Sequence, residues 1–176
     1  EHLIQGFYDR VLAEHERTSA ERLVGLTTLA ERLYAHLDVW FEAMGRYHEF
    51  AAAFFRTAAD PSSPMSPFSA DSAATRQASI DRFRDVVAGA EPPPPELVRD
   101  ELPELLWLFH MGLILFWVHD RSPGQVGTRL AVARTVPLIV KAVGLVDVPE
   151  LRSLVDDITA LLRDLRSRGL DEDTLV

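Results

Sequence analysis

The sequence contains no cysteine, and this absence alone removes several kinds of chemistry. Disulfide bonds, thiolate metal sites and cysteine nucleophiles all require that residue. Long apolar runs are also missing, since the longest, Leu105 to Val118, is shorter than the roughly 18 to 20 residues that cross a bilayer, and His110 interrupts it. No basic segment followed by an apolar run and a small-residue cleavage site opens the chain. We therefore expect a cytoplasmic protein with no membrane partner.

Positive charge is scarce as well. The chain has 27 Asp and Glu against 18 Lys and Arg, a formal net charge of -9 over 176 residues, and Lys141 is its only lysine. Proteins that hold nucleic acid usually present a basic stripe that neutralises phosphates. The 47% share of hydrophobic residues is that of an ordinary folded domain. The composition therefore predicts one globular domain that does not bind nucleic acid by itself.

The short motifs of common enzymes are absent too. The chain has no Gly-x-Ser-x-Gly elbow, no P-loop and no Rossmann glycine pattern. No histidine is followed by another three or four residues later, and no glutamate by a histidine three residues on, so helical metal motifs are missing. We therefore predict no catalytic residues, no resident metal, no cofactor and no enzymatic activity.

One dipeptide, His119-Asp120, leaves an enzymatic alternative open. Helical metal-dependent phosphohydrolases of the HD type use adjacent His and Asp as metal ligands and need further ligands from other helices. The residues available for that purpose are His48, His110, Asp147 and Asp156. The structural interpretation, which we favour, is that His119 binds carbonyl groups at a helix end while Asp120 leads into the following turn.

Helical spacing of apolar residues runs through nearly the whole chain, without the alternation typical of strands. Thr18 and Glu21 match a capping box, which predicts a helix with a leucine stripe from Leu23 to Leu37. Prolines and serines between Asp60 and Pro67 predict a loop, because proline cannot continue a helix. These signals already separate the first half of the chain into several helices.

Further start and stop signals divide the second half of the chain. In chain order they are Ser66-Pro67 for a helix that reaches Gly89, the connector Pro92–Pro95, Pro103 as a kink or restart in a helix from Glu96, Ser122–Gln125 for a helix that reaches Gly144, and Asp147 with Glu150 for the last helix. We predict an all-α domain of about seven helices over residues 1–176.

Aromatic residues and methionines recur at helical spacing in the middle of the chain. Large apolar side chains with a few polar tips usually line a pocket for a small apolar molecule. The alternative is a packed core that is rich in aromatic residues. The candidate ligand-binding residues are Trp40, Phe41, Met44, Tyr47, Phe54, Phe83, Trp107, His110, Met111 and Ile114.

The helix predicted from Pro103 to Asp120 is apolar almost all round. A helix that is apolar on both sides is buried on both sides. One side can face the domain, and a symmetric partner can cover the other, so that this helix and the one after Ser122 form a four-helix seam in a homodimer. The candidate interface residues are Phe109, Leu113, Phe116, Trp117, Val126, Leu130, Ala133 and Pro137.

With these features the sequence resembles the TetR family of bacterial transcriptional regulators. The opening segment Glu1–Tyr8 looks like the helix that links the DNA-binding headpiece to the regulatory domain. The segments Leu106–Leu113 and His119–Gly124 are similar to one branch of such regulators. The resemblance implies a regulatory domain that binds a small effector between its middle helices and dimerises through its late helices. The N-terminal helix-turn-helix that would contact operator DNA is expected to be missing from this chain.

The resemblance also implies a mechanism for a repressor. A small apolar effector would favour one orientation of the linking helix, change the headpiece spacing and release DNA. Operator half-sites lie about 34 to 36 Å apart, so that small changes in spacing matter. The alternatives are the HD-like phosphohydrolase and a helical protein-interaction module.

Overall fold

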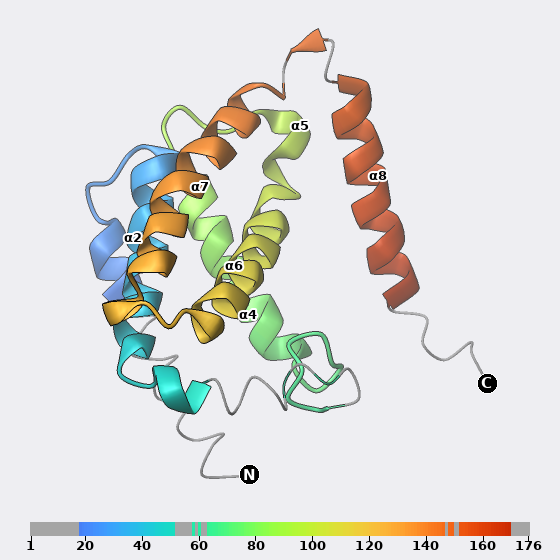
Figure 1. The fold of residues 1–176 in the computed structure, drawn as a ribbon. Coiled ribbons are helices and arrows are strands. Elements are labelled where there is room, and N and C mark those ends of the chain that lie inside the picture. The colour runs from blue at the N-terminus through green and yellow to red at the C-terminus, as the bar shows by residue number, and fades with distance from the viewer. Residues whose placement is uncertain are drawn as a thin grey trace, which may run out of the picture.

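The structure, a computed structural model, describes residues 18–51, 58, 60, 63–146, 148–149 and 152–169. Within these ranges every regular element is helical and no strand occurs, which confirms the predicted all-α class. A bundle of α2, α4, α6 and α7 forms the body, and α8 stands beside it on the side of α5 and α6 (Figure 1). The elements are α2 (Leu29–Gly45), α4 (Ala73–Ala88), α5 (Glu96–Arg99), α6 (Leu102–His119), the 3-10 turn η1 (Pro123–Gln125), α7 (Val126–Gly144) and α8 (Arg152–Gly169).

The leucine-striped helix begins later than the sequence predicted. Residues 18–23 are helical, but this helix ends before Gly25, whose φ of +79° lies in the left-handed region that favours glycine. The start signal of α2 is a different capping box. The Thr28 hydroxyl accepts a hydrogen bond from the Glu31 amide at 3.2 Å, and the Glu31 carboxylate accepts one from the Thr28 amide at 3.1 Å. The predicted continuity from Leu23 to Leu37 is therefore wrong, because Gly25 interrupts it.

Arg32 in α2 ties the turn before its own helix to the end of α4. Its guanidinium donates hydrogen bonds to four backbone carbonyl oxygens, those of Leu23 (3.4 Å), Leu26 (2.9 Å), Asp85 (2.8 Å) and Val86 (2.9 Å). Carbonyl groups at a helix end have no partner within the helix, so a cation placed there satisfies them. A Cβ atom at Gly89 would collide with this guanidinium, which explains the glycine that follows α4.

The core of the bundle lies between α2, α4, α6 and α7. The most deeply buried apolar residues are Leu33, Leu37, Phe83, Val86, Leu106, Trp117 and Val136, none more than 1% exposed. In α6 the buried stripe runs through Leu106, His110, Leu113 and Trp117 at spacings of four, three and four residues. Two residues of this stripe, Leu113 and Trp117, were expected to face a partner, and the stripe leaves Leu108, Gly112, Leu115 and Phe116 on the exposed side.

By length and composition alone, α6 could cross a membrane, since it is longer than the apolar run in the sequence suggested. In the folded chain 44% of its 18 residues are buried against other parts of the protein. It packs on α4 and α7, with α5 at its beginning. Pro103 lies in its first turn, so proline restarts the helix after the short α5 and does not kink a continuous one.

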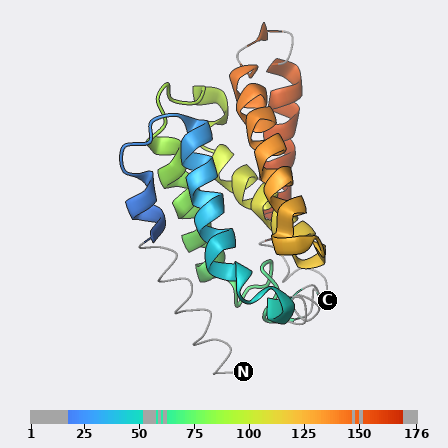
Figure 2. The same ribbon diagram turned by 60° about the vertical axis from the view of Figure 1, so that its left-hand side comes forward.

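Figure 2 shows the turn that joins α6 to the beginning of α7. This turn is organised by Asp120. Its buried carboxylate accepts four hydrogen bonds: from the amide and hydroxyl of Ser122 at 2.9 and 2.6 Å, and from the amide and hydroxyl of Thr128 at 2.7 and 2.8 Å. Burial raises the pKa of this carboxyl, but the hydrogen bonds outweigh burial and hold the pKa well below its usual range.

The predicted Ser-Pro-Gly-Gln start of α7 is therefore corrected in detail. Residues 123–125 form η1, and Gly124 and Gln125 have φ values of 59° and 53°, so that Gln125 does not occupy the third position of a regular first turn. Asp120, upstream of the turn, supplies the capping carboxylate. The Ser122 hydroxyl still helps, because it accepts a hydrogen bond from the Gly127 amide at 2.9 Å.

Pro137 lies inside α7, where it cannot donate the usual hydrogen bond to the carbonyl four residues earlier. That carbonyl belongs to Ala133, and the Tyr34 hydroxyl of α2 donates a hydrogen bond to it at 3.0 Å. A side chain from the neighbouring helix thus replaces the missing backbone donor and ties α2 to α7.

Several other helix boundaries differ from the sequence predictions, and some predicted segments lie outside the described residues. The helix expected from Ser66-Pro67 begins at Ala73, because residues 63–72 form a series of turns held by serine hydroxyls and by Arg76, which donates to the Pro67 carbonyl at 2.7 Å. The connector Pro92–Pro95 is not helical, as predicted. The linking helix expected at Glu1–Tyr8 and the caps Asp147 and Glu150 lie outside the described residues.

Candidate functional site

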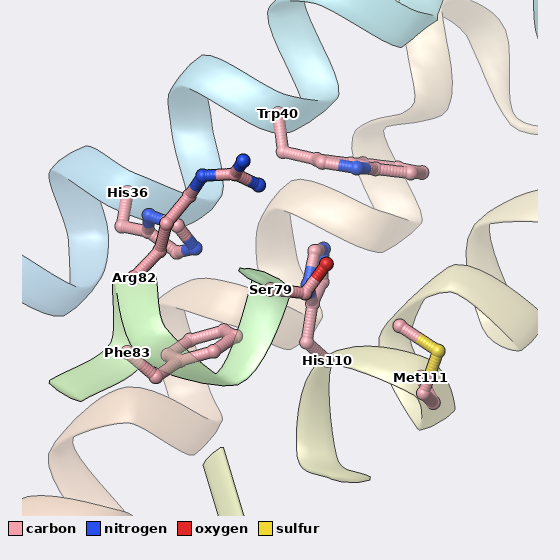
Figure 3. A pocket seen from close by; sticks show the side chains of 7 residues that line it. All are labelled: His36, Trp40, Ser79, Arg82, Phe83, His110 and Met111. Carbon is pink, nitrogen blue, oxygen red and sulfur yellow. The ribbon is translucent and has the colours of Figure 1, made fainter. Parts of the chain in front are cut away.

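A cavity of about 50 Å³ lies between three helices of the bundle. One wall comes from α2, one from α4 and one from α6, so that segments far apart in the sequence meet at one place (Figure 3). The lining residues are His36 and Trp40 of α2, Ser79, Arg82 and Phe83 of α4, and His110 and Met111 of α6. The i, i+4 spacing of His36 with Trp40, and of Ser79 with Phe83, places each pair on one helix face.

Two buried histidines stand among the aromatic rings of this cavity. His36 is 2% exposed and His110 is 5% exposed. The His110 ring has its centroid 5.0 Å from that of Trp40 and 5.7 Å from that of Phe83, with edge-to-face geometry in both pairs. The His36 ring packs on Phe83 at 4.5 Å. The cavity therefore combines aromatic faces with imidazole nitrogens.

Arg82 and Ser79 add polar groups from α4. Arg82 is half-buried, and Figure 3 shows its side chain extending from α4 toward α2. Burial lowers the pKa of the Arg82 guanidinium from its ordinary value, while the nearby Asp85 acts in the opposite direction. Ser79 donates a hydrogen bond to the Thr75 carbonyl at 3.0 Å, which holds its hydroxyl against its own helix.

His36 also connects the cavity to the helix that precedes α2. Its Nδ1 lies 3.1 Å from the hydroxyl of Ser19, a residue that is only 4% exposed. A second link on the same two segments is exposed: Arg22 pairs with Glu42 at 2.8 Å. Because Ser19 lies in the helical segment 18–23, a side chain of the cavity wall touches the N-terminal part of the described chain directly.

The structure brings only some of the ten residues that were proposed for a ligand pocket to the cavity. Trp40, Phe83, His110 and Met111 line the cavity. Trp107 lies instead in the main core, with its ring 5.5 Å from that of Phe68. Phe54 lies outside the described residues. The others, Phe41, Met44, Tyr47 and Ile114, belong to or pack against a second cluster that centres on Trp117 and Val118.

Sequence reasoning missed three lining residues: His36, Ser79 and Arg82. A signal for two of them was present, because His36 lies one helical turn before Trp40 and Ser79 one turn before Phe83. A search for large apolar side chains passes over such polar neighbours. Arg82 precedes Phe83 directly, and its position in the cavity follows from the reach of its long side chain.

The residues proposed for a dimer seam also divide into two groups. Exposed on the surface are Phe116 of α6 and Val126, Leu130, Ala133 and Pro137 of α7, while Phe109 is half-buried. Leu113 and Trp117 are 5% and 1% exposed, because they lie on the buried stripe of α6. Their assignment to a partner-facing surface is therefore wrong.

Three of the side chains that the HD-like alternative would use as metal ligands, those of His119, Asp120 and His48, form hydrogen bonds within the protein. His119 donates from Nδ1 to the Leu115 carbonyl at 2.9 Å, and the Asp120 carboxylate is occupied by Ser122 and Thr128. His48 donates from Nε2 to the Trp117 carbonyl at 2.6 Å. Among the described residues no three His, Asp or Glu side chains are grouped as metal ligands would be, and Asp147 lies outside this part of the chain.

Comparison with known families gives one finding at the level of the whole domain. A family model described as the tetracyclin repressor-like, C-terminal domain matches residues 32–161, which include the cavity, the core of the bundle and most of α8. A comparison with curated proteins finds no match for the chain.

Proposed function

The chain belongs to the family of TetR-like C-terminal domains, and on that basis we propose that it senses a small effector in the cavity between α2, α4 and α6. The observation that carries this proposal is the position of the cavity. Its wall residue His36 contacts Ser19 in the helix before α2, so that occupancy of the cavity acts on that helix. The effector would be small and bound mainly by aromatic side chains.

The signal passes from the cavity to the N-terminal helix through short contacts. A ligand that displaces His36 changes its contact with Ser19, and the Arg32 guanidinium holds the turn after this helix against α4. In the parent protein, residues 18–23 would follow the linking helix expected from Glu1–Tyr8, and that linking helix would lead to a DNA-binding headpiece in the cytoplasm. Effector binding would then shift the orientation of the helix, change the headpiece spacing and release a repressor from its operator.

Blocking the cavity is expected to remove a bound effector without unfolding the domain. We expect native mass spectrometry of the wild-type chain to detect a co-purified small molecule, and Ser79→Leu to reduce the bound fraction by about tenfold or more, because the leucine fills space that a ligand needs. Ser79 itself is half-exposed, so that a larger side chain at this position should leave the buried core folded.

The matched control is Thr75→Leu, one turn earlier on α4 and exposed. This variant adds the same side chain outside the cavity and is expected to keep the wild-type bound fraction. Equal loss in both variants, or a wild-type chain that never carries or binds a small molecule, would contradict an effector site between these helices.

We further propose that α6 and α7 form the seam of a homodimer. Their outer surface carries large apolar side chains that are exposed to solvent in the isolated chain, among them Phe116 (49% exposed), Leu130 (55%) and Leu138 (62%). Gly112 lies on the same exposed side of α6 and has open space around its Cα, so that a partner helix can approach closely there. Exposed large apolar side chains on two neighbouring helices are typical of an interface.

Charge in the centre of this seam is expected to separate the subunits. Leu130→Arg places a cation in an apolar surface that already has Arg129 and Arg134 nearby, and we expect it to raise the dimer dissociation constant by about tenfold or more. Sedimentation velocity would follow the species at twice the chain mass of 19.7 kDa.

Val24→Arg is the control for this change, since Val24 is 81% exposed in the turn before α2 and lies outside the proposed seam. It should leave the dimer unchanged. A wild-type chain that sediments as a monomer at high concentration would refute the seam, as would dissociation by Val24→Arg to the same degree.

A further inference from the structure

The lining of the cavity carries polar groups that an apolar effector does not require. Five of its seven lining residues, His36, Trp40, Ser79, Arg82 and His110, carry side-chain nitrogen or oxygen atoms that can form hydrogen bonds, and the other two are Phe83 and Met111. None of the seven is an aspartate or glutamate. The wall therefore has a cation and hydrogen-bonding groups but no carboxylate of its own.

The cation is Arg82, and its surroundings favour an anionic ligand. The side chain is half-buried, and desolvation, which lowers its pKa against the opposing effect of the nearby Asp85, also makes a further negative charge beside it more favourable than in water. A guanidinium presents planar, paired N–H groups that match the two oxygens of a carboxylate. An imidazole in either protonation state keeps at least one N–H group, so that the two histidines also suit a ligand that accepts hydrogen bonds.

We propose that the effector is a small carboxylate with an aromatic or apolar body, in which Arg82 binds the carboxylate and Trp40, Phe83 and Met111 pack against the body. This inference rests on the proposed function, because it names the chemical class of the effector for the same cavity. It replaces the purely apolar effector expected from the sequence with an amphipathic anion.

The volume of the cavity indicates how such a molecule fits. The space of about 50 Å³ has room for a headgroup, whereas pockets for drug-sized ligands measure roughly 300 Å³ or more. Met111 is half-buried at the rim of this space, and its unbranched side chain changes rotamer readily. The body of the ligand would therefore displace Met111 and open the cavity between α4 and α6.

Three probes of similar size separate charge from shape: benzoate, its neutral analogue benzamide, and phenyl phosphate. Titration calorimetry, with intrinsic tryptophan fluorescence, to which Trp40 contributes, as a second readout, would measure their dissociation constants for the full chain. We expect benzoate to bind about tenfold more tightly than benzamide, and Arg82→Gln to weaken benzoate by about tenfold while changing benzamide by about twofold or less.

Arg84→Gln is the matched control, because Arg84 lies on the same helix but is exposed and paired with Asp81. It should keep the wild-type affinity for benzoate. Thermal melts of both variants would show that each is folded.

The possible outcomes distinguish this inference from the proposed function. Tighter binding of benzamide than of benzoate, or an equal loss in Arg82→Gln and Arg84→Gln, would overturn the carboxylate while leaving the cavity as an effector site. Preference for phenyl phosphate over benzoate would assign the anion to a phosphate instead. Saturable binding by none of the three probes would overturn the carboxylate class, and a co-purified ligand lost in Ser79→Leu would still support the site.

Discussion

Replacing Asp120 with alanine is expected to lower the free energy of unfolding by about 3 to 4 kcal/mol, which corresponds to a fall of roughly 10 °C in Tm for a chain of this size. The variant removes the acceptor for four hydrogen bonds at once, those from the amides and hydroxyls of Ser122 and Thr128. Thr128 is 1% exposed, so that its two donors lose their partner where water does not replace it. Urea unfolding followed by circular dichroism would measure the loss.

The contribution of Asp120 should also depend on pH in a defined direction. Its pKa is lowered in the folded chain relative to the ordinary value of 3.8, so that folding favours the ionised form. The stabilisation is therefore complete above the unfolded-state pKa and is lost as the pH falls from there toward the lowered folded-state pKa. The stability difference between the wild-type chain and Asp120→Asn should be constant near neutral pH and shrink in strong acid.

Gly127 provides an independent test of the same turn. A Cβ atom at this position would lie 3.0 Å from Oδ2 and 3.1 Å from Oδ1 of Asp120. Alanine in the first turn of a helix usually adds about 1 kcal/mol of stability relative to glycine. Because the carboxylate is held by four donors and cannot move aside, we expect Gly127→Ala to destabilise α7 instead. A stabilised Gly127→Ala, or an Asp120→Ala loss below about 1 kcal/mol, would contradict this account of the turn.

Replacing Arg32 with methionine is expected to lower the free energy of unfolding by about 3 kcal/mol, because a charged donor that satisfies several helix-end carbonyls is lost. Methionine keeps the length and apolar stem of the side chain but cannot donate to Leu23, Leu26, Asp85 or Val86. Arg32→Lys should recover less than half of the loss, since one ammonium group cannot reach carbonyls on both sides.

The effect of Arg32→Met should also be local. Hydrogen exchange is expected to accelerate in residues 18–27, because the guanidinium links the turn after Leu23 to α4. Arg84→Met is the control, since Arg84 is exposed and forms an ion pair with Asp81 one turn away; it should change stability by about 0.5 kcal/mol or less. Equal losses in the two variants would show that Arg32 acts only as a surface charge.

Periodicity alone could predict most of the helices. Apolar spacing identified the all-helical class, and Pro103, Gly144 and Pro92–Pro95 lie at or beside boundaries where the sequence predicted them. The errors arose where two local signals compete. Thr18 with Glu21 and Thr28 with Glu31 both match a capping box, and the sequence analysis used the first of them for a helix that the structure divides at Gly25.

The residues of the candidate site were harder to predict from the sequence than the helices were, for a physical reason. Helical spacing places Trp40, Phe83 and His110 on inward faces, but it does not distinguish a cavity wall from a packed core, as Trp107 shows. Polar residues such as Arg82 are expected on solvent faces, and their burial depends on how closely α2 and α4 approach. In α6, apolar residues occur on every face, so that the sequence pattern did not identify the buried stripe described above. Trp117 was therefore assigned to the wrong side.

The hydrogen bond from Tyr34 to the carbonyl freed by Pro137 has a consequence for a protein with two copies of the cavity. Tyr34 lies two residues before the cavity residue His36 on α2, and Pro137 lies on the helix proposed to meet the partner. A shift of α2 on ligand binding would therefore be carried into the proposed seam, and a second subunit would experience it before its own ligand arrives. The two cavities of such a dimer would not fill independently, and the saturation curve would be sigmoidal or biphasic instead of hyperbolic.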